Sequence, residues 1–469
     1  MRVRIFSFLL VISLFLPNGL VAAQNQTDYP SYEIRPGDSL GLIANLFGTT
    51  IEEITQLNNI DNPDLISPGQ KILIPGYSGF KGTLQFISTD LGETFSLLPI
   101  KYHVEHASIL RFNPLLSPAS IFAGSELILL IPEEAMPLLP VAIVESAQTG
   151  LETAGRLTVN PQMQMIQNEL NGSSHYLPGK VIFANDDGTK TNLDLFSPPL
   201  KEVSISPLPL VQGGTQVISV VSDQPISLSG SLGDKPLEFF SSEPGSYYAL
   251  QGVHALQDPG LLDFNINVSF SDGSVESFTQ PVLVTPGFFD VDPPLNVDPS
   301  TIDPSVTGPE NELVYFLISK ISPTRHWETI FSSPAYYQEY NSLYGTRRRY
   351  NDDPIIYFHT GVDFAGGMTL PITSPAPGVV VFAGPLTVRG NAVFIDHGWG
   401  VFSGFFHQDT ILVNVGDFVE TGQQIGTVGN TGRVNGAGDY QGAGAHLHWE
   451  LWVNGVQINP LDWLTYQYP

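Results

Sequence analysis

The stretch GAHLHWELW, residues 444–452, sets two histidines one residue apart in a pattern typical of a β-strand. Successive side chains of a strand point to opposite faces, so His446 and His448 share one face while Leu447 and Trp449 take the other. Two neighbouring imidazoles suit a metal site or a proton-transfer site. They also occur as an ordinary pair without such a role, and other parts of the chain have to decide between these hypotheses.

More histidines and a carboxylate lie upstream of this strand. His359 and Asp363 are four residues apart in YFHTGVDFAG, and His397 and His407 lie in NAVFIDHGWGVFSGFFHQD. Three imidazole or carboxylate ligands with a fourth position left open form a catalytic zinc site. Because the chain has no cysteine, one histidine of the strand pair would complete the set with His359 and Asp363. His397 is expected to hold a turn.

Residues 340–462 resemble the lysostaphin-like M23 metallopeptidases of bacterial cell walls. The resemblance rests on HTGVD, VFIDHGWG, the stretch around His407, VNVGDFVETGQQIGTVGNTGR and HLHWEL, in this order. It implies a mainly antiparallel-β peptidase domain over residues 326–469 with Zn2+ as cofactor. It further implies that zinc is bound by His359, Asp363 and His448, and that His407 and His446 are the catalytic residues that move protons and stabilise the oxyanion.

Three stretches depart from the family pattern or have no settled role. The family's Tyr-Ala-His-Leu pattern is replaced by FFHQD, in which Phe405 lacks a hydroxyl. The insert VNGAGDYQGAGA, residues 434–445, is longer than the usual turn and has Ala445 in place of proline, which leaves bond specificity open. The basic cluster TRRRY, residues 346–350, either contacts anionic peptide carboxylates or is a solvated surface cluster.

Length and composition set the frame for the rest of the chain. At 469 residues it is long enough for about two to four domains. Its 45 glycines and 38 prolines favour short strands and turns over long helices. The formal net charge of −27 argues against nucleic acid or an anionic membrane surface as a partner, because both attract basic patches.

The N-terminus, MRVRIFSFLLVISLFLPNGLVAAQ, has two arginines, then an apolar run, and then small residues that suit a cleavage site. This pattern predicts a secretory signal peptide over residues 1–23, and hence a secreted protein of the cell envelope or cell wall. The alternative is an uncleaved membrane anchor, but the apolar run is short for a membrane span. We expect no later membrane span, and without cysteine neither a disulfide nor a lipid attached at cysteine can form.

Residues 32–76, YEIRPGDSLGLIANLFGTTIEEITQLNNIDNPDLISPGQKILIPG, combine the signals of a strand, two helices and a second strand. PGDSL, the helix-ending Asn58 and SPGQKILIP resemble the LysM module. The resemblance implies a LysM domain over residues 29–76 that binds chains containing N-acetylglucosamine, above all the glycan of peptidoglycan.

The module recurs with a period of 55 residues, which indicates a tandem array. Asn58 is followed at this period by Asn113 and Asn168, and Gly69 by Gly124 and Gly179. We expect a LysM-like copy over residues 83–133 and a degenerate LysM-like copy over residues 138–186. Either all copies bind glycan and raise avidity, or only the first binds and the others are spacers.

Residues 200–286 alternate apolar and polar residues between turns rich in Gly, Pro, Asp and Ser, which predicts an all-β sandwich. The stretch GSYYALQGVHALQDPGLLDFNINVSFSDGS resembles an immunoglobulin-like module. Residues 287–325 begin with a Pro- and Asp-rich segment that indicates a linker or a strap over the neighbouring domain. Its acidic residues match no calcium-binding loop, so a solvated linker is favoured over a calcium site.

These features predict a secreted zinc endopeptidase that hydrolyses peptide cross-links of peptidoglycan and docks on the glycan through LysM modules. One alternative is a non-catalytic, wall-binding activator of other hydrolases, and another is a zinc endopeptidase of a secreted protein. The retained ligands argue against the first alternative and the LysM modules against the second. The cross-link that is cut stays open, as does whether the linker or an N-terminal module blocks the groove.

Overall fold

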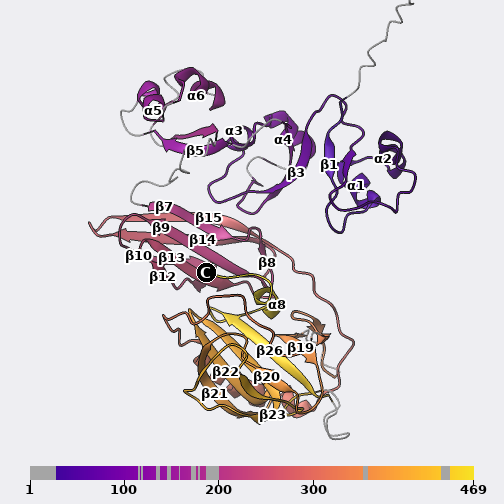
Figure 1. Ribbon diagram of the computed structural model, residues 1–469, viewed down its shortest axis with the longest axis vertical. Coiled ribbons are helices and arrows are strands. Elements are labelled where there is room, and N and C mark those ends of the chain that lie inside the picture. The colour runs from indigo at the N-terminus through magenta and orange to yellow at the C-terminus, as the bar shows by residue number, and fades with distance from the viewer. Residues whose placement is uncertain are drawn as a thin grey trace, which may run out of the picture. The chain divides into compact units, whose positions relative to one another are not determined.

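The computed structural model describes residues 28–469 apart from several short gaps (Figure 1). The gaps are 115–116, 118–119, 134–137, 145–148, 158, 169, 171–175, 178–179, 186–199, 338, 352–356 and 435–443. The predicted signal peptide lies outside the described residues. The described residues form two compact units, which divide between Leu84 and Gln85. In the described part, every helix is too short or too polar to cross a membrane.

The first unit contains the β-α-α-β order that its sequence predicts. Its elements are β1 (Ser31–Glu33), α1 (Leu40–Phe47), α2 (Ile51–Asn58) and β2 (Lys71–Leu73). Ser39 caps α1, and Thr50 forms a capping box with Glu53 at the start of α2, so both helices begin where a side-chain oxygen can accept an end N–H. Ile43 of α1 and Ile54 of α2 are buried.

The same order of elements recurs twice further along the chain. The second copy consists of β3 (Thr83–Ser88), α3 (Leu98–Tyr102), α4 (His106–Phe112) and β4 (Glu126–Ile131). The third consists of β5 (Leu138–Ile143), α5 (Gly150–Arg156), α6 (Pro161–Gln167) and β6 (Val181–Asn185), with β5 antiparallel to β6.

One asparagine in each copy makes the same three hydrogen bonds. Its Nδ2 donates to the carbonyl four residues earlier and to the carbonyl fifteen residues later, and its Oδ1 accepts from the N–H of that later residue. These asparagines are Asn58, Asn113 and Asn168, and the later residues are Leu73, Ile128 and Phe183. The 55-residue period is therefore a repeat of structure, in which a side chain ties the second helix to the last strand. The predicted turn glycine Gly179 lies outside the described residues.

Residues 200–285 form two sheets around one core, antiparallel except for the parallel pair of β8 and β15. The strands are β7 (Leu200–Ser206), β8 (Leu210–Val211), β9 (Thr215–Ser222), β10 (Ile226–Leu232), β11 (Lys235–Pro236), β12 (Phe240–Glu243), β13 (Ser246–Gly252), β14 (Gly260–Phe270) and β15 (Val275–Thr285). The sheet orders are β11-β10-β14-β15-β8 and β12-β13-β9-β7. Ile218 and Val220 of one sheet share the core with Phe264 and Ile266 of the other. The likeness to an immunoglobulin module stays a prediction.

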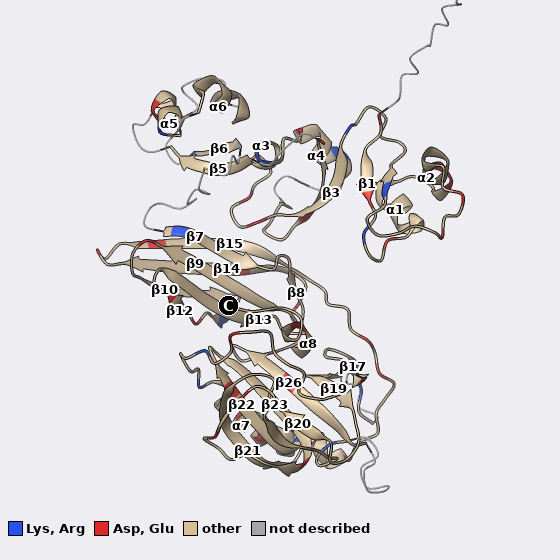
Figure 2. Ribbon diagram, viewed as in Figure 1, with Lys and Arg blue, Asp and Glu red and all other residues tan. Residues whose placement is uncertain are grey.

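The segment after β15 follows the course of a strap over the neighbouring domain, which is one of the two predictions made for it, and its second half is a helix rather than a linker. The segment pairs with the peptidase region, Val291 with Arg347 and Leu295 with Tyr350. It continues into the 3-10 turn η3 (Pro299–Thr301) and the helix α7 (Pro304–Ile318). Asp303 caps α7 and Pro304 occupies its first turn, a start signal obscured in the sequence by a second proline inside the helix. Figure 2 shows acidic residues along this connection as well as over the sheets and repeats.

The C-terminal region is built on one sheet that the structure shows with ten strands, antiparallel throughout its described pairings. The main order is β16-β19-β26-β23-β22-β21-β24, with β20, β25 and β27 attached. These strands are β16 (Tyr340–Ser342), β19 (Val362–Ala365), β20 (Pro371–Thr373), β21 (Gly378–Leu386), β22 (Gly390–Gly398), β23 (Val401–Ile411), β24 (Phe418–Val419), β25 (Gln424–Val428), β26 (His446–Val453) and β27 (Val456–Ile458). A separate pair, β17 (Arg347–Arg348) and β18 (Tyr357–Phe358), and the helix α8 (Pro460–Trp463) complete it.

Candidate metal centre and active site

The candidate ligands are brought together by two neighbouring strands. β19 pairs antiparallel with β26, so that Asp363 lies opposite His448. Residues directly opposite in such a ladder point to the same face, and His446 shares that face because it is two residues from His448. Leu447 and Trp449 point to the other face, where both are fully buried. The alternation expected from HLHWEL is therefore present.

Three donor atoms converge on one point. Nε2 of His359 lies 3.0 Å from Oδ1 of Asp363 and 2.9 Å from Nδ1 of His448. Nδ1 of His448 lies 2.6 Å from the same carboxylate oxygen. All three side chains are buried, and among the described residues they form a group whose ligand atoms lie within 4.8 Å of one another.

Hydrogen bonds on the far side of each ring determine which nitrogen faces this point. Nδ1 of His359 donates to the Leu343 carbonyl at 3.0 Å, and Nε2 of His448 donates to Oε1 of Glu450 at 3.1 Å. The inward nitrogens are then lone-pair acceptors beside the Asp363 carboxylate. Three acceptors facing one point require a cation, and two imidazoles with one carboxylate are a zinc donor set. The residues present therefore fit zinc.

Burial and charge act on these groups in opposite directions. Burial raises the pKa of the Asp363 carboxyl, but the imidazoles of His359 and His446 outweigh it and hold that pKa well below its usual value. Burial lowers the pKa of His359 to about 4, so this imidazole is neutral at neutral pH. Burial also lowers the pKa of His448, but the negative charge of the Asp363 carboxylate outweighs it and raises that pKa. An ionised carboxylate beside two imidazoles favours a positive charge at this point.

The two predicted catalytic histidines lie beside the ligand group. The ring centres of His407 and His446 are 4.9 Å apart, and Nε2 of His446 is 3.5 Å from Oδ1 of Asp363. Nδ1 of His407 donates to the Thr431 carbonyl at 2.7 Å, and Nδ1 of His446 donates to the Gly444 carbonyl at 2.6 Å. Each ring therefore keeps Nε2 as a proton acceptor. Burial lowers the pKa of His407 well below its usual value, so it is neutral at neutral pH.

Glu450 is a further residue of the site, missed by the sequence analysis. It is 2% exposed, its Oε1 accepts from the Thr360 hydroxyl, and its Oε2 accepts from Nε2 of Gln457 at 2.8 Å. Burial raises the pKa of Glu450, but its hydrogen bond with His448 and the charge of Arg389 outweigh this and lower that pKa. Since Glu450 is two residues after His448 on the same strand, the alternation of β26 could have placed it on the face of the site.

The basic cluster 346–350 is only in part a solvated patch. Arg348 lies between two carboxylates, with Nη2 3.2 Å from Oδ2 of Asp363 and Nε 2.9 Å from Oδ2 of Asp292. Arg347 donates to the Ala255 carbonyl at 2.9 Å, while Arg349 is exposed. Arg348 thus binds carboxylates of the protein itself, an arrangement that neither hypothesis from the sequence included.

His397 is not part of the ligand group. His397 is fully buried, and its Nδ1 donates to the Pro377 carbonyl at 2.8 Å while its Nε2 accepts from the Ser403 hydroxyl at 2.9 Å. These contacts tie β22 to its surroundings, and the expected role of His397 in holding a turn stays a prediction. Most of the insert, residues 435–443, lies outside the described residues.

Two family models match the chain, LysM domain over residues 32–75 and Peptidase family M23 over residues 357–460. Peptidoglycan DD-endopeptidase ShyC of Vibrio cholerae is 34% identical over 128 residues, 27% of this chain and 28% of the relative. Murein hydrolase activator NlpD of Salmonella dublin is 36% identical over 105 residues, 22% of this chain and 26% of the relative. The chain thus matches about a quarter of the length of each relative.

A solved structure titled a putative peptidase M23 from Pseudomonas aeruginosa covers 55% of this chain and 96% of its own, at 23% identity and a TM-score of 0.40. That TM-score is too low for a comparison of the whole arrangement. The M23 match spans the motifs HTGVD and HLHWEL, which supply the converging side chains, and the LysM match spans the first β-α-α-β module. Residues 357–460 of the chain therefore belong to peptidase family M23, and residues 32–75 to the LysM domain family.

Proposed function

We propose that this protein is a secreted zinc endopeptidase that hydrolyses peptide cross-links of peptidoglycan. The observation that carries the proposal is the convergence of Nε2 of His359, Oδ1 of Asp363 and Nδ1 of His448. The rings are held in the tautomers that bind a metal by the Leu343 carbonyl and the Glu450 carboxylate.

These three residues would hold the zinc ion. When bound, zinc supplies Lewis-acid activation of water and of the scissile carbonyl. His407 and His446 would accept and return protons through Nε2, because each is fixed through Nδ1 by a backbone carbonyl. His407 is suited to be the base, since its burial keeps it neutral in the resting protein.

The repeats would hold the enzyme on its polymeric substrate. The first copy is a LysM domain by family match, and the other two copies share its element order and its asparagine bridge. Weak linked modules raise the residence time on a polymer without one tight site. Deleting residues 29–185 is expected to weaken co-sedimentation with purified sacculi, and unchanged co-sedimentation would remove this docking role.

The test of the reaction is digestion of purified sacculi of several cross-link types, read by mass spectrometry of the released fragments. The wild type is compared with its chelated form, the zinc-restored form and the variant His446→Ala. Release of uncross-linked fragments that stops with chelator and returns with zinc would support the proposal and name the bond. No release from any wall by zinc-loaded wild type would refute it.

A non-catalytic activator remains the second candidate because the matched relative NlpD carries that name. An activator needs the peptidase fold but none of the proton-transfer histidines. It would stimulate another wall hydrolase equally as wild type and as His446→Ala, whereas the proposed enzyme loses its own cleavage in that variant.

A further inference from the structure

The connection between the sandwich and the peptidase sheet contacts the candidate metal centre. We call residues 288–310 the strap. Its first half pairs with residues 347–350 through two backbone bridges, and Asp292 and Leu295 donate N–H groups to the carbonyls of Arg347 and Arg349 at 2.9 Å. The strap lies outside the region matched to peptidase family M23, which begins at residue 357.

At its first end the strap reaches the metal centre through one arginine. Oδ2 of Asp292 is 2.9 Å from Nε of Arg348, and Nη2 of Arg348 is 3.2 Å from Oδ2 of Asp363. The same Nη2 donates to the Ser342 hydroxyl at 2.7 Å. The side chains of Arg348 and Asp363 are only 13% and 10% exposed, so water screens this chain of contacts weakly.

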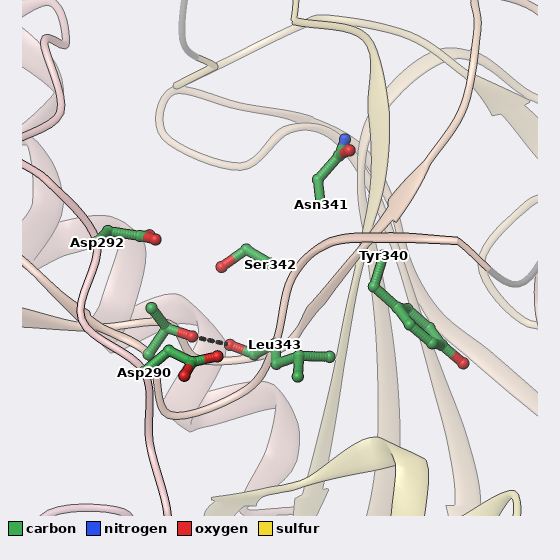
Figure 3. Close-up of a pocket in the computed structure, with 7 residues that line it drawn as sticks. Asp290, Asp292, Tyr340, Asn341, Ser342 and Leu343 are labelled. Carbon is green, nitrogen blue, oxygen red and sulfur yellow. Dashed lines mark hydrogen bonds between the residues drawn. The ribbon is translucent and has the colours of Figure 1, made fainter.

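The surroundings of Asp292 are a small open pocket. It is lined by two of the strap's aspartates and by the segment that precedes the cluster of arginines: Asp290, Asp292, Tyr340, Asn341, Ser342, Leu343 and Thr346. In Figure 3 the carboxylate of Asp292 and the hydroxyl of Ser342 point toward one another from opposite walls. Arg348 thus has hydrogen-bond partners on the strap and on β16, and its position depends on both.

At its other end the strap is anchored inside the peptidase domain. Glu310 is 6% exposed and accepts from the N–H of Val388 at 2.8 Å and from Nη1 of Arg389 at 2.9 Å. The carbonyl of Arg389 accepts the N–H of His407 at 2.9 Å. Both ends of the strap are therefore fixed to residues that touch the candidate site.

We propose that Asp292 of the strap is a positioning residue for the metal centre and acts through Arg348 on Asp363. This inference rests on the proposed function. Arg348 occupies Oδ2 of Asp363 and leaves Oδ1 to face the two histidines. Asp292 balances the guanidinium charge, because an arginine with Asp363 as its main partner would draw that carboxylate away from the metal. Mutation of residues that orient metal ligands in this way typically lowers metal affinity by about 10–100-fold.

The test is the zinc affinity of the full chain, measured by competition with a chromogenic chelator. Asp292→Asn and Arg348→Gln are each expected to weaken zinc binding by about 10–100-fold. The double variant should bind zinc no more weakly than Arg348→Gln, since Asp292 acts only through that arginine. The control Asp303→Asn removes the same charge from the strap and keeps a capping side chain on α7, so its zinc affinity should stay within about twofold of wild type.

Unchanged zinc affinity in Asp292→Asn would overturn the inference, and so would losses that add in the double variant. If Arg348→Gln does not fold, Arg348→Lys replaces it, because lysine keeps the charge but cannot bind two carboxylates with a planar fork. That variant must also weaken zinc binding. A wild type that binds zinc and cleaves sacculi while Asp292→Asn matches it would sink this inference alone. A wild type that binds no zinc would refute the proposed function instead.

Discussion

Asp363 and His448 lie directly opposite each other in β19 and β26, with Oδ1 and Nδ1 2.6 Å apart. The metal centre is therefore a property of strand register. A slip of one residue would place Phe364 or Leu447 at this point and turn the polar side chains into the core. Changes that alter this pairing should act on metal binding even when no ligand is touched.

The two histidines of β26 should differ in what they contribute. His448→Ala removes a ligand and is expected to abolish zinc retention after dialysis, measured by elemental analysis. His446→Ala removes a side chain 3.5 Å from the Asp363 carboxylate and should keep zinc while losing at least about 100-fold in turnover. Full zinc in the first variant, or near-normal turnover in the second, would mean that the roles are misassigned.

Gly361, the residue directly before β19, lies against the backbone of β26. A Cβ at Gly361 would lie 2.3 Å from the Trp449 carbonyl oxygen, so Gly361→Ala must push the strands apart. We expect a loss of about 1–3 kcal/mol in unfolding free energy together with weakened zinc binding. Gly367→Ala is the matched control because a Cβ there meets nothing within 4 Å. Equal behaviour of the two variants would contradict the argument.

Glu450 should set the tautomer of His448. Glu450→Gln would place an amide group against the donors of Gln457 or His448, so one hydrogen bond is lost in either orientation. Zinc affinity is expected to fall by about 10–100-fold. The exposed Glu420→Gln carries the same charge change and should retain wild-type affinity, and a similar loss in both variants would point to net charge as the cause.

Buried His397 should make folding sensitive to acid. Burial lowers its pKa in the folded protein to about 4, against 6.5 when exposed, so the unfolded chain binds more protons between these values. The free energy of unfolding is therefore unaffected by protonation of His397 above about pH 6.5. It falls as the pH is lowered toward 4, by roughly 3 kcal/mol. His397→Gln should flatten this part of the stability curve from denaturant titrations, whereas the exposed His106→Gln should not. A slope unchanged in His397→Gln would disprove the assignment.

The repeated asparagine bridge should matter most in the third copy. Asn168 is 1% exposed and its bonds to Phe183 are buried, whereas the bonds of Asn58 to Leu73 are exposed. Asn168→Ala should lower the local opening free energy of β6 by about 1–3 kcal/mol, and Asn58→Ala should lower that of β2 by less. Hydrogen exchange at the Phe183 and Leu73 N–H groups measures both. Equal losses would show that water does not replace the exposed bonds.

Features that depend on neighbours along the chain could be predicted from the order of the amino acids. The alternation in HLHWEL placed His446 and His448 on one face because a strand has a period of two, and the spacing of Asn58, Asn113 and Asn168 revealed the repeat. The start of α7 also carries a local signal, Asp303 followed by Pro304, but Pro309 inside the helix masked it. Packing decided that this segment forms a helix and not a linker, since Glu310 is buried against Val388 and Arg389.

Which side chains surround the ligands depends on contacts between residues far apart in the chain. Arg348 contacts Asp363, which is 15 residues away in the chain, and Asp292, which is 56 residues away. No periodicity of a helix or strand connects residues at such separations. Arg348 binds two carboxylates of the protein because its guanidinium is largely buried. A buried charged group needs charged or polar partners. Local patterns set the direction of each side chain, and the register of β19 on β26 with the course of the strap set which ones meet.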